Sequence, residues 1–188
     1  MGAFRLSSAS PEQIAAILAA QRHAPLSYEP VGAASTPEGW FDNRGGTWLG
    51  TGPATFEKAR RSLQAWVHFD IGWVTAVPEA GATIAPGAVV AVLTRTFGLA
   101  SVNIAKVIAV TDEPRRFAFS YGTTAHHVES GEETFAITWH PDDRVTYDVW
   151  SYSRPAHPLV KLFAPIARSL QRRFIVDSCE RLRVECAR

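Results

Sequence analysis

The densest group of side chains that could take part in chemistry lies in YGTTAHHVESGEE, residues 121–133. It holds a tyrosine, two adjacent histidines and three carboxylates, which are groups used in acid–base catalysis and in metal binding. Neighbouring positions on a strand point to opposite faces, so only one of His126 and His127 can face a cavity. The histidine spacing is not that of a metal site, and we predict no metal and no cofactor. A hairpin with solvated charges is the commoner interpretation of such a stretch. The catalytic candidates within it are Tyr121, His127, Glu132 and Glu133.

Two of these candidates begin a predicted strand that contains Phe135. Alternation places Glu133 on the face of Phe135 and Glu132 on the other face. Whichever face is the core, one carboxylate would point inward and need a partner. An inward ion pair is as consistent with a structural role as with a catalytic one. The cations that could pair with it are Arg95, Lys106 and Arg154.

A histidine also lies where a strand meets a helix, in SYSRPAHPLVKLF. Pro155 and Pro158 disfavour helix at the residues before them, so we expect an extended chain through Arg154 and His157. His157 would then precede a helix N-terminus, where it either fastens the strand to the helix or hydrogen-bonds a ligand at the mouth of a cavity. We favour the fastening role.

Aromatic side chains complete the candidates for a binding site. The short GTGP motif lacks the lysine of a phosphate loop, and no Gly-x-Ser-x-Gly motif occurs. Aromatic residues at strand or helix spacing are usually core residues, but Tyr and Trp also carry a polar group that suits the wall of a cavity. The predicted ligand-binding residues are Tyr28, Trp73, Arg95, Tyr121, Trp150, Tyr152, Arg154 and His157.

The composition is that of an ordinary soluble protein, and the length fits one domain over residues 1–188. Nineteen basic and eighteen acidic residues leave a net charge of +1, which favours neither nucleic acid nor anionic membranes. No apolar stretch could span a membrane, and the N-terminus lacks a secretory pattern. Cys179 and Cys186 would lie roughly 10 Å apart on a helix, too far for a disulfide. We predict a cytoplasmic protein with no nucleic-acid partner and no stable membrane insertion, and the sequence does not specify its oligomeric state.

The elements that must position these residues begin with helices. Ser10 as N-cap and Pro11 in the first turn predict an N-terminal helix. Residues 35–46 are rich in turn formers and are predicted to be a loop. A short strand and a second helix, which starts near Pro53, follow this loop.

Strands and one long helix make up the rest of the chain. From residue 87 onward, β-branched and aromatic residues alternate in a meander of strands separated by turn signals. A helix is predicted from residue 158 to residue 185, kinked or restarted at Pro165. Its predicted apolar stripe consists of Leu159, Leu162, Phe163, Ile166, Leu170, Phe174, Ser178 and Leu182.

An antiparallel sheet with one apolar face needs a cover, and the last helix is the only predicted element long enough. We therefore predict an α+β fold in which a curved antiparallel β-sheet wraps around a long C-terminal helix, with an extra N-terminal helix. Sheets that grip a helix in this way often leave a ligand cavity between the two.

Four segments resemble one family of bacterial and plant proteins catalogued as a domain of unknown function: YEPVG, LGTGPATFEKARRSLQAWVHFDIGW, FSYGTTAHHVESGEETFAI and SRPAHPLVKLFAPIARSLQRRF. The match covers nearly the whole chain, and it includes His127 but not His126. The family is similar to a remote branch of the START-like, birch-allergen-like (SRPBCC) superfamily, the helix-grip fold of lipid carriers, hormone receptors and polyketide cyclases. The resemblance implies a fold and a class of ligand but no reaction. A helix before the first strand departs from many helix-grip proteins.

Our first hypothesis is that the protein binds a small hydrophobic or aromatic molecule between the sheet and the C-terminal helix. One alternative is a cofactor-independent enzyme with cyclase, aromatase or hydrolase-like acid–base chemistry in the same cavity. It requires Tyr121, His127, Arg154 and either Glu132 or Glu133 to converge there within hydrogen-bond reach. A second alternative is a protein-interaction module with a filled core.

Overall fold

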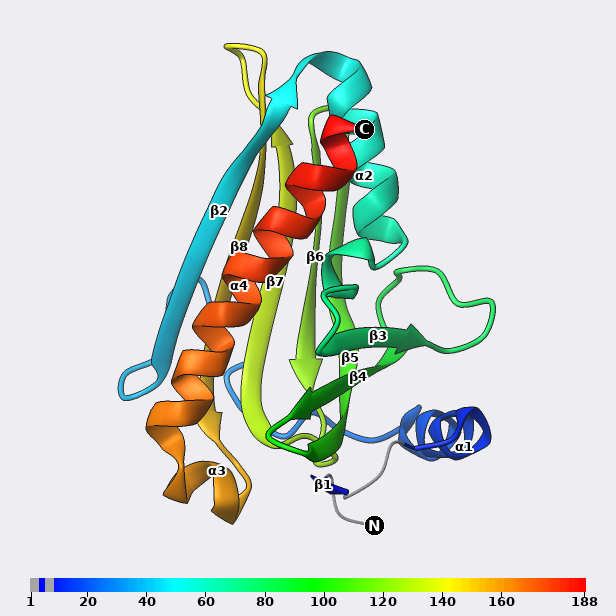
Figure 1. The fold of residues 1–188 in the computed structure, drawn as a ribbon, viewed down its shortest axis with the longest axis vertical. Coiled ribbons are helices and arrows are strands. Elements are labelled where there is room, and N and C mark those ends of the chain that lie inside the picture. Colours follow the sequence, from blue (N-terminus) through cyan, green and yellow to red (C-terminus); the bar gives the residue numbers. More distant parts are fainter. Residues whose placement is uncertain (1–3, 6–8) are drawn as a thin grey trace.

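The computed structural model describes residues 4–5 and 9–188. Its centre is an antiparallel sheet with the strand order β2-β8-β7-β6-β5-β4-β3, and β1 pairs with β5 (Figure 1). The meander predicted from the alternating residues is therefore confirmed, and β2 closes the sheet at its far edge beside β8. The strands are β1 (Phe4–Arg5), β2 (Phe41–Thr51), β3 (Val74–Pro78), β4 (Val89–Thr96), β5 (Leu99–Glu113), β6 (Arg116–Thr123), β7 (Glu129–Trp139) and β8 (Arg144–Pro155). The helices are α1 (Pro11–Gln21), α2 (Gly52–Gln64), the short 3₁₀ helix η1 (Val67–Phe69), α3 (Pro158–Leu162) and α4 (Ala164–Ala187).

Helix α4 crosses the concave face of the sheet, and α2 lies beside its C-terminal part (Figure 1). Phe174 and Leu182 of α4 are buried with Phe119 and Phe135 of the sheet in the main hydrophobic core. Each such side chain contributes about 1.5–3 kcal/mol by leaving water. Tyr147 of β8 and Ser178 of α4 share a buried hydrogen bond of 2.8 Å. The prediction that a curved sheet grips the last helix is thus confirmed.

The N-terminal helix begins as predicted. The Ser10 side chain accepts a hydrogen bond from the backbone N–H of Gln13, and the Gln13 side chain accepts one from the backbone N–H of Ser10. This reciprocal capping box satisfies two of the donors that a helix start leaves free. Ile14 and Leu18 of α1 pack in a second, smaller cluster against β4 and β5.

Strand β2 starts earlier than predicted. A loop was expected over residues 35–46, but the chain is already a strand from Phe41, so that expectation was wrong for the second half of the segment. The glycines that favoured a loop serve a packing purpose instead. A Cβ atom at Gly45 would overlap Cγ2 of Ile175, because α4 lies directly on this part of β2. Glycine inside a strand often marks such a close approach.

We expect Gly45→Ala to lower the free energy of unfolding by about 1–3 kcal/mol, because the added methyl group overfills the contact between β2 and α4. Urea unfolding followed by circular dichroism measures the loss. The control is the double variant Gly45→Ala/Ile175→Ala, in which the vacated space accepts the new methyl group. Its loss should be smaller than the sum of the two single losses, and strict additivity would contradict the packing explanation.

The C-terminal helix is divided at Phe163, with Pro165 in the first turn of α4, which agrees with the predicted restart. The stripe prediction was wrong for its first half. Leu162 is 71% exposed and Phe163 is 52% exposed, and Leu159 and Ile166 are also exposed. The break leaves α3 at one end of the sheet (Figure 1), and none of its residues belongs to the main hydrophobic core.

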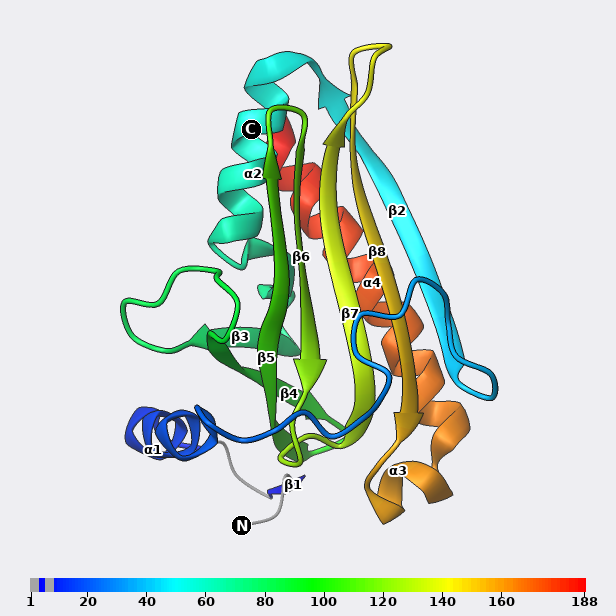
Figure 2. The same ribbon diagram turned by 180° about the vertical axis from the view of Figure 1, so that it is seen from behind.

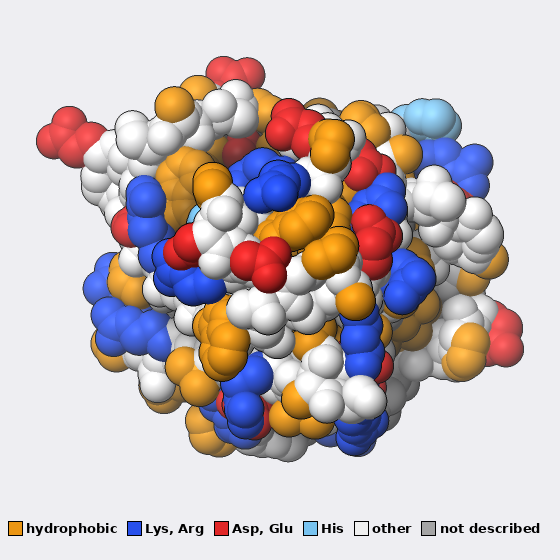
Figure 3. All heavy atoms as spheres, turned by 90° about the horizontal axis from the view of Figure 1, so that it is seen from above, with side chains coloured by type: hydrophobic (Ala, Val, Ile, Leu, Met, Phe, Trp, Pro, Cys, Tyr) orange, Lys and Arg blue, Asp and Glu red, His pale blue; other side chains and the backbone are white. Residues whose placement is uncertain are grey.

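The end of the molecule that carries α2 and the C-terminus has interspersed acidic and basic side chains (Figure 3). This mixture agrees with the small net charge of +1. None of the helices described in the structure is long and apolar enough to cross a membrane. Cys179 and Cys186 are free thiols, as their spacing predicts.

Candidate functional site

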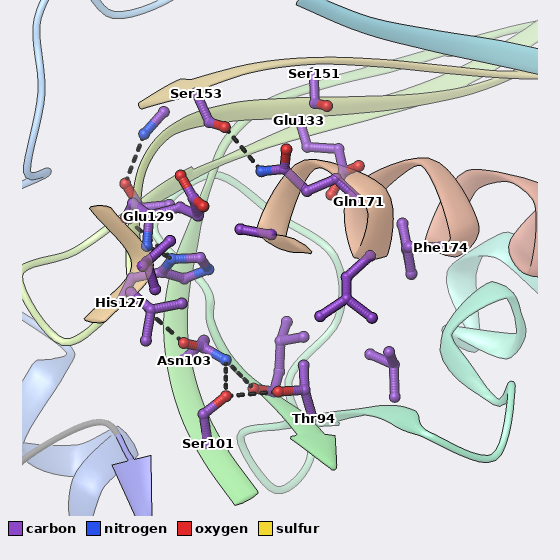
Figure 4. Close-up of a pocket in the computed structure, with 18 of the residues that line it drawn as sticks. Thr94, Ser101, Asn103, His127, Glu129, Glu133, Ser151, Ser153, Gln171 and Phe174 are labelled. Carbon is purple, nitrogen blue, oxygen red and sulfur yellow. Dashed lines mark hydrogen bonds between the residues drawn. The ribbon is translucent and has the colours of Figure 1, made fainter. Parts of the chain in front are cut away.

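A pocket of about 220 Å³ lies between the concave face of the sheet and helix α4. That volume is below the ~300–1,000 Å³ of sites for drug-sized ligands. In Figure 4, His127 and Glu129 lie at one end of the pocket, Phe174 lies at the other, and Glu133 lies beside Gln171. A ligand that fits here must be compact.

The best-defined polar pair in the pocket joins two neighbouring strands. Tyr121 of β6 and Glu133 of β7 are direct cross-strand partners, and the Tyr121 hydroxyl donates a hydrogen bond of 2.6 Å to Glu133 Oε2. Burial raises the pKa of Glu133 to about 7, and the hydrogen bond from Tyr121 opposes that rise. Burial also raises the pKa of Tyr121 well above its ordinary value. A carboxyl group that titrates near neutral pH can both release and accept a proton, so this pair could support acid–base chemistry.

The sequence prediction for this pair is partly confirmed. Glu133 shares the inward face with Phe135, as alternation requires. Its hydrogen-bond partner is a tyrosine and not one of the predicted cations, because Tyr121 stands directly opposite it on β6.

A second polar group comes from the turn between β6 and β7. His126 and His127 lie in this turn and not on a strand, so the argument from opposite strand faces does not apply to them. The backbone N–H of Glu129 donates to His127 Nδ1 at 3.0 Å, and we assign the ring proton of neutral His127 to Nε2. Burial lowers the pKa of His127 to about 4, so the ring is neutral at physiological pH. The turn was expected to carry solvated charges, but both His127 and Glu129 line the pocket.

Glu129 is a pocket residue that the sequence analysis missed. Burial raises its pKa to about 7, opposed by a hydrogen bond with Ser153 and by the charge of Arg168. Its Oε2 atom is buried and has no hydrogen-bond partner among the described residues. The predicted strand began at Glu132. Extending the same alternation back by two positions beyond Gly131 would have placed Glu129 on the face of Glu133.

Two amide side chains were also missed. Asn103 is buried on β5, where its amide nitrogen donates to Ser101 Oγ at 2.8 Å and to the Val92 carbonyl at 3.3 Å. Gln171 of α4 donates to Ser153 Oγ at 2.9 Å. A polar residue on an amphipathic helix normally indicates the solvent face, so only the packed structure reveals that Gln171 faces the pocket.

Glu132 contributes to the pocket wall, but its carboxylate turns to the opposite, convex side of the sheet. The segment between α1 and β2 crosses that side (Figure 2). Its Tyr28 hydroxyl donates to Glu132 Oε1 at 2.7 Å, and the backbone N–H of Gly32 donates to the same atom at 2.6 Å. Tyr28 reaches this position because Gly122 has no side chain, and a Cβ atom there would overlap the Tyr28 hydroxyl.

Several predicted ligand-binding residues share this convex side with Tyr28. Tyr152 is buried there and accepts a hydrogen bond of 3.3 Å from the backbone N–H of Ala33. The Trp150 indole donates to Asp42 Oδ1 at 2.9 Å. The Arg154 guanidinium lies 4.6 Å from the centre of the Trp40 ring. None of Tyr28, Trp150, Tyr152 and Arg154 lines the pocket.

The three remaining candidates are on other elements. Trp73 lines the pocket, and its indole donates to Asp177 of α4 at 2.8 Å. Arg95 is exposed on β4 and does not line the pocket. His157 is the N-cap of α3 and accepts a hydrogen bond of 3.2 Å at Nδ1 from the backbone N–H of Leu159, while its own backbone N–H donates to the Val128 carbonyl. The ring of His157 therefore caps its own helix, and its backbone bonds the chain just before β7.

Across residues 4–5 and 9–188, no three His, Cys, Asp or Glu side chains are arranged to hold a metal ion. The pocket thus brings together Tyr121, His127 and Glu133 from the catalytic candidates and Trp73 from the ligand-binding candidates. It leaves out Arg154, which the enzyme hypothesis also required, and the Glu132 carboxylate, in place of which that hypothesis accepts Glu133.

A curved antiparallel sheet around a C-terminal helix, with a pocket between them, is a helix-grip fold. The Zhui aromatase/cyclase from Streptomyces sp. R1128 superimposes with a TM-score of 0.55 at 10% identity, covering 79% of this chain and 94% of that one. Ara h 8.0201 superimposes with a TM-score of 0.50 at 14% identity, covering 79% of this chain and 99% of that one. At these identities the likeness shows the fold alone.

Within this class, the chain belongs to the family described as domain of unknown function DUF1990, whose model matches residues 27–181. A UPF0548 protein of Dictyostelium discoideum is 36% identical over 146 residues, which are 71% of this chain and 67% of the relative. A UPF0548 protein of Deinococcus radiodurans is 31% identical over 182 residues, which are 90% of this chain and 92% of the relative. The resemblance seen in the sequence is confirmed.

Proposed function

We propose that the protein binds a small, largely apolar or aromatic molecule in the pocket between the sheet and helix α4. The observation that carries this proposal is the pocket itself, which has an aromatic and aliphatic side and a side with hydrogen-bonding groups. Small-molecule sites are typically apolar concavities with a few polar groups that fix the orientation of the ligand. A helix-grip fold with such a pocket favours ligand binding over an interaction module with a filled core.

The apolar side of the pocket is formed by Phe69, Trp73 and Phe174, with Val92 from the sheet. Trp73 is held by its hydrogen bond to Asp177, so its ring is already oriented without a ligand. A preformed apolar wall lowers the cost of ordering side chains on binding. The opposite polar side offers the ring of His127 and the carboxyl groups of Glu129 and Glu133.

Addition of 2-phenylethanol, a compact aromatic alcohol, is expected to shift the backbone amide NMR signals of residues 129–133 and 167–174 at millimolar concentration. Ser151 lines the pocket from β8, so Ser151→Phe should fill it and abolish these shifts. The matched control is Ser120→Phe, because Ser120 lies on the opposite face of the sheet and bonds Thr134 there. The proposal is overturned if wild type shows no shifts in these residues, or if a folded Ser151→Phe variant keeps them.

A further inference from the structure

We infer that the ligand of this pocket carries a positively charged nitrogen, a conclusion that rests on the ligand-binding function proposed above. The carboxyl groups that face the pocket are those of Glu129 and Glu133, and no lysine or arginine is among the lining residues. The other titratable groups that face it are the neutral ring of His127 and the protonated hydroxyl of Tyr121. The pocket therefore has acidic and neutral groups but no cation.

Arg168 and Arg173 of α4 do not line the pocket, and each contacts other groups. The Arg173 guanidinium lies 5.1 Å from the centre of the Trp73 ring and pairs with Asp177 at 3.1 Å. Arg168 acts electrostatically on Glu129, but its guanidinium lies 5.0 Å from the centre of the Phe41 ring. A ligand carboxylate or phosphate in the pocket would face two carboxyl groups without a lining cation, and burying an unpaired charge is costly.

The pocket also contains acceptor atoms that a cationic donor would satisfy. Glu129 Oε2 is buried without a partner among the described residues. Glu133 Oε2 accepts from Tyr121, and an ionised carboxylate has further lone pairs that can accept other donors. A buried acceptor without a donor carries a desolvation cost. A protonated amine brings up to three N–H donors and no acceptor, which is the complement of these atoms.

Protonation of the two carboxyl groups supports the same conclusion. Burial raises the pKa of both Glu129 and Glu133 to about 7, so neither is held permanently ionised in the empty pocket. An ammonium group nearby favours the ionised form and lowers both pKa values. Two buried charges are thus avoided when no cation is near, and an ion pair forms when the ligand supplies the opposite charge.

The rest of the ligand must be apolar and short. Glu129 and Glu133 are four residues apart on β7, and Figure 4 shows them at separate places around the pocket, with Phe174 beyond Glu133. A cationic group at either carboxyl would leave the body of the ligand against Phe69, Trp73 and Phe174. The ligand class is therefore a compact arylalkyl or alkyl amine.

The test compares three probes of similar size and different charge: 2-phenylethylamine, 2-phenylethanol and phenylacetate. Affinity is measured at pH 7 by NMR titration of the amides of residues 129–133. We expect the amine to bind at least about tenfold more tightly than the alcohol, since a charge-assisted hydrogen bond commonly has an effect of that size. Phenylacetate should bind more weakly than the alcohol.

Replacing the carboxyl group of Glu129 or Glu133 by an amide should remove the preference for the amine over the alcohol. Glu129→Gln and Glu133→Gln should each reduce the affinity for the amine about tenfold relative to the affinity for the alcohol, and strengthen binding of phenylacetate. The control is Glu113→Gln, since Glu113 is exposed at the end of β5 outside the pocket.

The outcomes separate the two proposals. Alcohol binding without a preference for the amine leaves the pocket function standing and overturns the inference about charge. The same holds if phenylacetate binds best, or if both Gln variants keep the wild-type preference. No binding of any probe overturns both proposals.

Discussion

Glu132→Ala is expected to lower the free energy of unfolding by about 3 kcal/mol, because it removes the shared acceptor of two donors on the convex side of the sheet. Glu132 is 6% exposed, and its Oε1 atom accepts from the Tyr28 hydroxyl and from the backbone N–H of Gly32. Each buried donor left without a partner costs about 1–3 kcal/mol. Without this acceptor, the segment between α1 and β2, which contains Tyr28, should also be held less firmly against the sheet.

Thermal unfolding measures this effect. A loss of about 3 kcal/mol corresponds to a fall of about 10 °C in Tm for a chain of this size. Glu132→Gln should lose less, since its amide oxygen still accepts both hydrogen bonds. The matched control is Glu133→Ala on the next residue, where the hydrogen bond that is lost among the described residues is the single one from Tyr121. Equal losses for the two Ala variants would show that the convex network is not the cause.

His68→Phe is expected to stabilise the protein in acid. The free energy of unfolding of the variant minus that of wild type should be about 3 kcal/mol larger at pH 4 than at pH 7. His68 is fully buried among aromatic rings, with the centres of the Phe69 and Phe135 rings each 4.6 Å from its own. Neither of its ring nitrogens has a hydrogen-bond partner among the described residues. Burial therefore lowers its pKa from 6.5 to about 3.

The direction of this pH dependence follows from the number of protons bound in the unfolded and native states. Between pH 6.5 and about 3, the unfolded chain binds a proton at residue 68 and the native protein does not. Stability then falls by up to about 1.4 kcal/mol for each pH unit of acidification in this window. The phenyl ring that replaces the imidazole of His68 cannot bind a proton, and it suits the aromatic surroundings.

Other buried groups make the comparison of variants necessary. The lowered pKa of His127, about 4, acts in the same direction as that of His68. The raised pKa values of Glu129 and Glu133, about 7, act in the opposite direction, because the native protein binds protons first as the pH falls from 7 toward 4.5. The difference between wild type and variant cancels these shared contributions.

Urea unfolding at a series of pH values from 7 to 4 measures the difference. The control is His23→Phe, since His23 is exposed in the turn after α1. A constant difference between wild type and His68→Phe across this range would contradict the assignment of a neutral, unpartnered His68.

Elements whose signals are local were predicted well. The capping box at Ser10 and the alternation of Phe117, Phe119 and Tyr121 depend on neighbouring residues alone, and both appear in the structure. The predictions failed where a distant element changes the meaning of a residue. Gly45 favoured a loop in the sequence, but it lies in a strand where α4 packs so closely that a side chain would not fit. Leu162 belongs to the predicted apolar stripe but is exposed, because the helix breaks at Phe163 and α3 lies apart from the main core.

The candidate site shows the same division. The sequence by itself determined that Glu132 and Glu133 lie on opposite faces, since the side chains of a strand alternate whatever the strand packs against. It also determined the family and, with it, the helix-grip fold. Only the tertiary structure decided which face is concave, that Glu129 and Gln171 reach the pocket, and that Tyr28, Trp150, Tyr152 and Arg154 lie on the other side. Those outcomes depend on strand pairing and on the curvature of the sheet around α4, which bring together residues far apart in the chain.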